Sequence, residues 1–66
     1  MHPIKEAFCA SIMDITTGAY VTEETEGTIK LGSYAERLLF YDEMEAETIL
    51  QVLNENYADC FTLIIE

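Results

Sequence analysis

The sequence predicts an α+β fold, a small antiparallel β-meander of four to five strands with one amphipathic helix on one face. β-rich segments separated by glycine-containing turns fill the first half of the chain, and an apolar stripe at helical spacing follows from about residue 43 to 56. The run 61–65 then predicts a C-terminal strand. Because the 66 residues contain no linker and no internal repeat, we expect a single domain over residues 1–66.

The first hairpin is predicted around Gly18. Apolar side chains alternate along residues 5–15, and Gly18 can adopt a positive φ in a short turn before the β-rich residues 20–23. The same run also fits a helix with Pro3 in its first turn, so periodicity alone leaves both structures open. The turn favours the strand.

A second turn over residues 24–27 leads into a strand at 28–31 and extends the hairpin to a meander. The short apolar run 37–41 predicts a strand buried on both faces. Ser33 with Glu36 three residues later could instead begin a helix there, because this pair has the spacing of a capping box.

The predicted helix over about 43–56 begins behind Asp42, which forms a second capping pattern with Glu45. Asn54 and Asn56 tolerate left-handed conformations and are expected to end it. Its apolar stripe, ready to pack on a sheet, consists of Ala46, Ile49, Leu50, Leu53 and Tyr57.

Both faces of the predicted sheet are partly apolar, because apolar residues occupy odd and even positions of the first and last strands. One helix covers only one face. The other face is exposed to a partner, closed in a homodimer through side chains such as Met13, Ile15 and Ile64, or shielded by loops and long side chains.

Charge sets the class of partner. Thirteen acidic residues against three basic ones give a net charge of −10, and no Lys or Arg follows Arg37. Such a field repels nucleic acid and anionic membranes and attracts basic protein surfaces. No stretch approaches the ~18 apolar residues of a membrane span, and the N-terminus lacks a signal-peptide pattern, so we expect a cytoplasmic protein.

Residues suited to catalysis are scarce. His2 is the only histidine, and beside the chain terminus we expect it to be an exposed bystander. Cys9 and Cys60 have no metal or redox spacing and are expected to act as small buried hydrophobes. The chain has no glycine-rich phosphate loop and no basic stripe with interleaved aromatics. We therefore expect no enzyme, no cofactor and no direct binding of nucleic acid.

Two acidic rows are the candidate partner-binding site. On the predicted helix Glu43 and Glu47 lie one turn apart, about 6 Å, and Glu55 continues that face. DNA carries one charge per about 3.4 Å of each strand, so carboxylates at such intervals can occupy part of a phosphate-binding groove. Acidic side chains also favour a helix N-terminus without any partner. The candidate residues are Glu23, Glu24, Glu26, Asp42, Glu43, Glu45, Glu47 and Glu55.

The same acidic run does not fit a calcium-binding loop, so we expect no metal. A loop that began at Asp42 would need Gly at its sixth position and Glu at its twelfth. The sequence has Glu47 and Leu53 there.

The chain resembles a class of short, strongly acidic, single-domain proteins without catalytic motifs, the phage-encoded anti-CRISPR and anti-restriction proteins, several of which are DNA mimics. The resemblance covers the whole chain and is carried by its size, its element order and the acidic rows at 23–26 and 42–47. It implies a protein of the infected bacterial cytoplasm that binds a nuclease or a CRISPR surveillance complex where target DNA normally lies. The alternative is an interaction module that pairs through its apolar sheet face.

Overall fold

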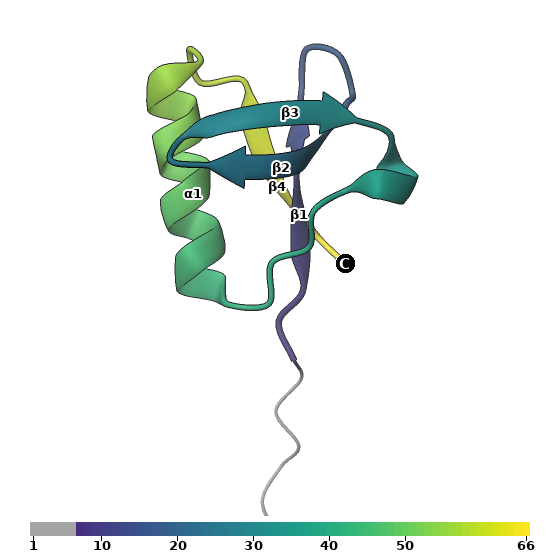
Figure 1. Ribbon diagram of the computed structural model, residues 1–66. Coiled ribbons are helices and arrows are strands. Elements are labelled where there is room, and N and C mark those ends of the chain that lie inside the picture. The colour runs from purple at the N-terminus through teal and green to yellow at the C-terminus, as the bar shows by residue number, and fades with distance from the viewer. Residues whose placement is uncertain (1–6) are drawn as a thin grey trace, which may run out of the picture.

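The computed structural model describes residues 7–66 and confirms the α+β class (Figure 1). Four strands form one antiparallel sheet in the order β3-β2-β1-β4, and one helix packs against it. The elements in chain order are β1 (Ala10–Asp14), β2 (Tyr20–Thr25), β3 (Thr28–Gly32), the 3-10 helix η1 (Tyr34–Glu36), α1 (Glu43–Asn56) and β4 (Phe61–Ile65). His2, Pro3 and the start of the predicted first strand lie outside the described residues.

The β1–β2 hairpin turns at Gly18, as predicted, with a φ of 76°. Asp14 organises the turn, because its carboxylate accepts hydrogen bonds from the Thr16 N–H at 2.9 Å and the Thr17 hydroxyl at 3.0 Å. Beyond the register pair Met13↔Tyr20 the two strands diverge, and β2 and β3 run across β1 and β4 (Figure 1).

The β2–β3 turn is tighter than the sequence indicates. Strand pairing continues to Thr25↔Thr28, so the loop consists of Glu26 and Gly27 alone. Both have positive φ, 51° and 81°, which is the backbone of a type I′ turn and matches the twist of the flanking strands.

The prediction of a strand over 37–41 is wrong. The single turn η1 ends just before this segment, and the segment itself forms one isolated bridge, Ala10↔Phe40. The physical reason is the divergence of β1 and β2: Leu38 donates to the Val21 carbonyl at 2.8 Å, and Phe40 then exchanges bonds of 2.8 and 3.0 Å with Ala10. The segment fills a wedge between two strands, which leaves no room for a continuous ladder.

Helix α1 has the predicted bounds and begins at the predicted cap. The Asp42 carboxylate accepts from the N–H groups of Met44 at 2.9 Å and Glu45 at 3.3 Å. Ala46 and Leu53 are fully buried. The buried core that joins the helix to the sheet consists of Ile12, Val21, Phe40, Ala46, Leu53 and Phe61.

The end of α1 differs from the prediction. Asn54 and Asn56 remain helical, and the residues with left-handed backbone are Ala58 and Asp59, with φ of 64° and 62°. Both asparagine side chains are used in tertiary contacts instead, which the sequence pattern does not indicate.

The sheet face opposite α1 is partly shielded by the chain itself. Tyr34 of η1 packs edge-on against Tyr20, with ring centroids 5.3 Å apart, and the Arg37 guanidinium lies 3.8 Å from the Tyr34 centroid. Arg37 also pairs with Glu66 at 2.7 Å, and the Ser11 hydroxyl donates to the same carboxylate at 2.7 Å. This arrangement supports the shielding alternative for this face, and the homodimer stays a prediction.

Candidate partner-binding surface

Two asparagine contacts fix how α1 is turned relative to the sheet. On one flank the Asn54 amide pairs with the Phe61 backbone of β4, accepting from its N–H at 2.8 Å and donating to its carbonyl at 3.2 Å. On the other flank the Asn56 amide donates to the Gly27 carbonyl of the β2–β3 turn at 3.4 Å. One helix flank therefore faces β4, and the opposite flank faces the turn.

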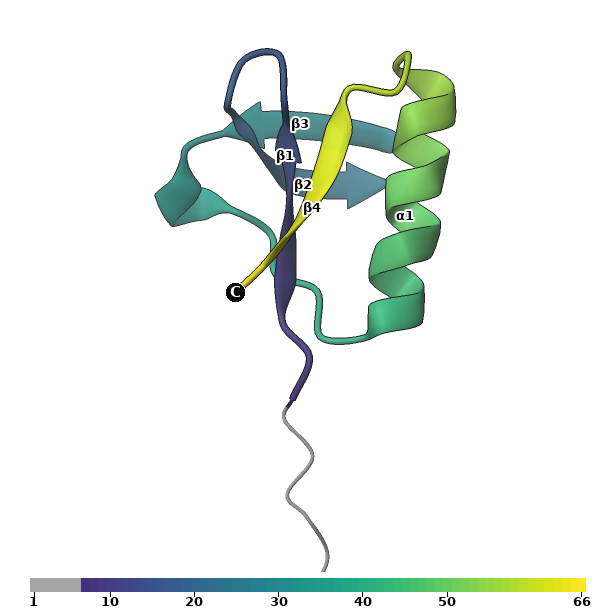
Figure 2. The ribbon, with the colours of Figure 1, turned by 180° about the vertical axis from the view of Figure 1, so that it is seen from behind.

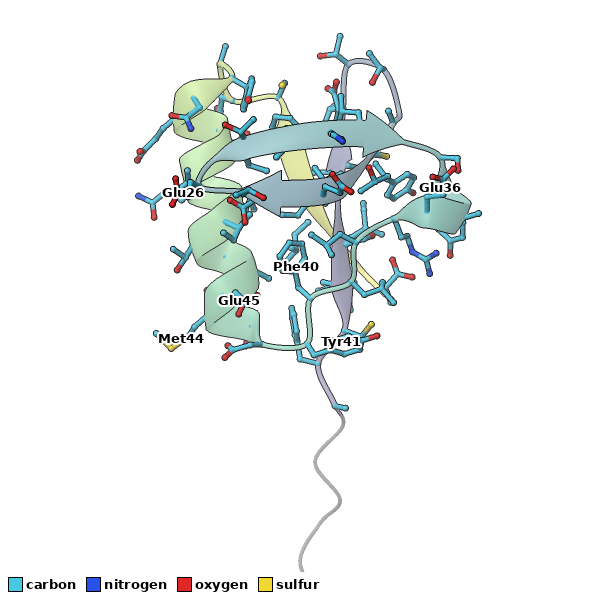
Figure 3. The ribbon with its side chains drawn as sticks, in the orientation of Figure 1. Glu26, Glu36, Phe40, Tyr41, Met44 and Glu45 are labelled. Atoms are coloured by element: carbon cyan, nitrogen blue, oxygen red, sulfur yellow. The ribbon has the colours of Figure 1, made fainter. Side chains whose placement is uncertain are left out.

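These anchors divide the helix acids between the two flanks. At 100° per residue, Glu43 and Glu47 fall within about 20° of Asn54 and belong to the β4 flank. Glu45 falls within about 20° of Asn56 and belongs to the turn flank. Figure 3 shows Glu45 on the side of α1 where Glu26 of the turn lies.

Glu55 lies on neither flank. It is exposed and accepts a hydrogen bond from the Gln51 amide at 3.3 Å. Because each i+4 step advances by about 40° around the axis, the row from Glu43 through Glu47 to Glu55 winds from the β4 flank onto the outer face. The sequence predicted these three carboxylates along one face of the helix, but in the structure they follow a spiral around its axis.

The three carboxylates of the β2–β3 hairpin differ in their availability. Glu23 pairs with Lys30 at 3.3 Å, an exposed ion pair. Glu24 accepts a hydrogen bond from the Gly27 N–H at 2.8 Å and so stabilises its own turn. Glu26 occupies the tip of the turn. The α1 flank that carries Asn56 and Glu45 faces this tip.

The positive charges lie elsewhere. Lys30 and Arg37 are the cations of the described chain, and they pair with Glu23 and Glu66. Within residues 7–66, none of the helix carboxylates at 43, 45, 47 and 55 forms an ion pair. No cation of the described residues therefore compensates the carboxylates on the α1 side. We name Glu26, Glu43, Glu45, Glu47 and Glu55 the acidic surface.

This surface can accept charge-assisted hydrogen bonds from guanidinium and ammonium groups. Within the described part of the chain, no three His, Cys, Asp or Glu side chains come together as a metal site. Nor does any helix there have the length and apolarity to cross a membrane. Burial, with the nearby Asp14 carboxylate, raises the pKa of the half-buried Cys60 thiol, which keeps it protonated and a weak nucleophile at neutral pH.

Comparisons with protein-family models, curated proteins and solved structures found no significant match to this chain. We therefore argue function from the charge and geometry of the acidic surface. The residues that sequence inspection missed are Asn54 and Asn56, which set the orientation of that surface. Asparagines at a helix end are ordinarily explained by local backbone preference, so no signal in the sequence separates that role from a tertiary one.

Proposed function

We propose that the protein is a small acidic inhibitor that binds the basic nucleic-acid-binding surface of a defence nuclease or a CRISPR surveillance complex. It acts as a DNA mimic and prevents the nuclease or complex from binding its target DNA. The observation that carries the proposal is the separation of charge. Both described cations are held in ion pairs away from α1, while the helix carries carboxylates that no described cation neutralises. A surface of this kind is complementary to a groove that binds phosphates.

The spacing of the acidic surface suits that groove. Glu43 and Glu47 are about 6 Å apart along the helix axis, close to the ~6.8 Å axial rise between alternate phosphates of one DNA strand, and the row to Glu55 spans about 18 Å. The alternative of pairing through the second sheet face has less support, because Tyr34, Arg37 and the Glu66 carboxylate occupy part of it.

Affinity capture with matched charge swaps tests the proposal. Wild-type protein, Glu47→Lys and Glu36→Lys are immobilised and exposed to bacterial lysate at about 50 mM and 200 mM salt, the range over which phosphate-groove binding weakens. The Glu36→Lys swap changes the net charge by the same amount as Glu47→Lys. It serves as the control because Glu36 lies on η1, away from the acidic surface (Figure 3). We expect wild type and Glu36→Lys to retain the same nucleic-acid-binding protein, released by high salt or duplex DNA, and Glu47→Lys to lose it. Retention by all three proteins would contradict the proposal.

A further inference from the structure

The two edges of the sheet are protected to different degrees. β3, at one edge, carries Lys30 and faces a β-bulge between Val21 and Glu23 in its neighbour, features that discourage pairing with another chain. β4, at the other edge, reads Phe-Thr-Leu-Ile-Ile, without a charged residue, and pairs with β1 in unbroken register. β4 is the edge on which an added strand meets the least obstruction.

The hydrogen-bond pattern shows which groups β4 offers. Ile15 donates to the Cys60 carbonyl at 2.8 Å, and Glu66 donates to the Cys9 carbonyl at 2.9 Å. In an antiparallel ladder this places the backbone groups of 60, 62, 64 and 66 toward β1, and those of Phe61, Leu63 and Ile65 toward the open edge.

One of these three residues is already satisfied. Asn54 pairs with both backbone groups of Phe61, much as a neighbouring strand would. Within residues 7–66, the N–H and C=O groups of Leu63 and Ile65 have no partner. β4 lies near α1 at its first residue and diverges from the helix toward its end (Figure 2). Ile65 is 67% exposed there.

The charge beside the open edge of β4 determines which kind of strand can pair with it. Glu43 and Glu47 lie on the helix flank that faces β4, as the Asn54 contact shows. In a symmetric pairing of β4 with a second copy, these flanks would approach each other and place like charges together, at a cost. A strand that carries positive charges would instead find complementary carboxylates.

We propose that an extended, basic segment of the protein's target adds to β4 as a fifth strand. Its backbone hydrogen-bonds to Leu63 and Ile65, and Lys or Arg side chains at alternate positions, which share one face of an added strand, reach Glu43 and Glu47. This inference rests on the proposed function for the nature of the target and adds the way in which the target is held.

The test uses three synthetic peptides of about nine residues against the full chain. One alternates Lys and Val, one alternates Glu and Val, and one has the Lys/Val composition interrupted by Pro so that it cannot form a strand. Binding is followed by amide NMR and calorimetry. We expect only the uninterrupted Lys/Val peptide to bind, with slowed hydrogen exchange at the amides of Leu63 and Ile65. This mapping needs no substituted protein.

Substitutions then separate the backbone and charge contributions. Ile65→Pro removes an outward N–H without removing a β1–β4 bond, and Ile65→Thr keeps that N–H as its control. We expect the first to weaken peptide binding about tenfold and the second less than about threefold. Glu43→Gln with Glu47→Gln should weaken it about tenfold, and Glu36→Gln, on η1 and away from the acidic surface, should leave it unchanged.

Equal binding of the Pro-interrupted peptide, or protection that maps away from β4, would overturn the added-strand inference. So would sedimentation that shows a dimer of the free chain, abolished by Ile65→Pro. The proposed function fails separately: if the peptide binds β4 but the captured target holds DNA and this protein together, the added strand stands and DNA mimicry does not. If this protein and DNA compete for the target while the peptide fails to bind, DNA mimicry stands and the added strand does not.

Discussion

Ala58 occupies a left-handed conformation, φ 64°, that L-residues with a Cβ adopt at a cost. Glycine takes the same backbone without that strain, so Ala58→Gly should raise the free energy of unfolding by about 1 kcal/mol and the melting temperature by about 5 °C. Thermal denaturation followed by circular dichroism measures both. A melting temperature that falls would mean that the entropy glycine adds to the unfolded chain outweighs the relief of strain.

Glu66 links stability to pH. The hydrogen bond from Arg37, and then that from Ser11, lowers the pKa of the Glu66 carboxyl below its ordinary value of 4.5. A carboxyl with a lowered folded-state pKa contributes stability that is fully present above the unfolded-state pKa and is lost as pH falls through the folded-state value. Wild type should therefore be more stable than Glu66→Gln at pH 7, and the difference should shrink as the pH falls below the ordinary value and through the lowered folded-state value. Urea unfolding of both proteins from pH 3 to 7 measures it, and a difference independent of pH would exclude this linkage.

Single residues also show where sequence inspection reaches its limit. Asp42 was predictable as a cap because the interaction is local, with donors two and three residues away. Arg37 and Glu66 were not predictable as partners, because 29 positions separate them in the chain and the fold alone brings them together. The same reason hides the contacts of Asn54 and Asn56.

At the scale of elements, the β2–β3 turn packs closely on α1 because Gly27 has no side chain. A Cβ on Gly27 would lie 2.8 Å from the Asn56 amide nitrogen and 3.2 Å from Val52, whereas one on Gly18 would meet nothing within 4 Å. Both glycines have positive φ. Ala substitution at either should cost about 1 kcal/mol for the backbone, and Gly27→Ala should cost about 1 kcal/mol more because it displaces the turn from the helix. Urea unfolding compares the two variants, and equal losses would show that the turn–helix contact contributes nothing.

The elements themselves were predictable to different degrees. α1 and the hairpins follow from periodicity and turn residues, which act over a few positions. The segment 37–41 has the composition of a strand, but a strand also needs a neighbour along its whole length. The divergence of β1 from β2 provides only the bridge at Phe40, and that divergence is a property of the sheet and not of the segment.

For the whole molecule, the uncompensated charge should weaken the compact state. The net charge is −10, and the acidic surface gathers carboxylates on the α1 side. We expect the melting temperature to rise as ionic strength increases from about 10 mM to 150 mM, because the screening length falls from roughly 30 to 8 Å. Scanning calorimetry in NaCl checks this prediction. A flat or falling melting temperature would show that repulsion among the acids does not limit stability.

The location of the acidic surface could be predicted only in part. Its helix acids, one turn apart, follow from the sequence, but their division between the β4 and turn flanks depends on the asparagine anchors. The engagement of Glu23 by Lys30 and of Glu24 by its own turn likewise required the structure. Of the eight carboxylates predicted as the site, four have no described hydrogen-bond or ion-pair partner and are the strongest candidates: Glu26, Glu43, Glu45 and Glu47.

Competition with DNA tests the central claim most directly. The captured target is titrated with duplex DNA and with this protein by interferometry, at low and high salt, using wild type, Glu43→Lys with Glu47→Lys, and Glu36→Lys as the charge control. We predict that wild type and Glu36→Lys displace DNA, that affinity falls steeply with salt, and that the double swap abolishes displacement while the circular dichroism spectrum stays native. A target that holds DNA and this protein at once, with affinity indifferent to salt and to the double swap, would contradict the proposed mimicry.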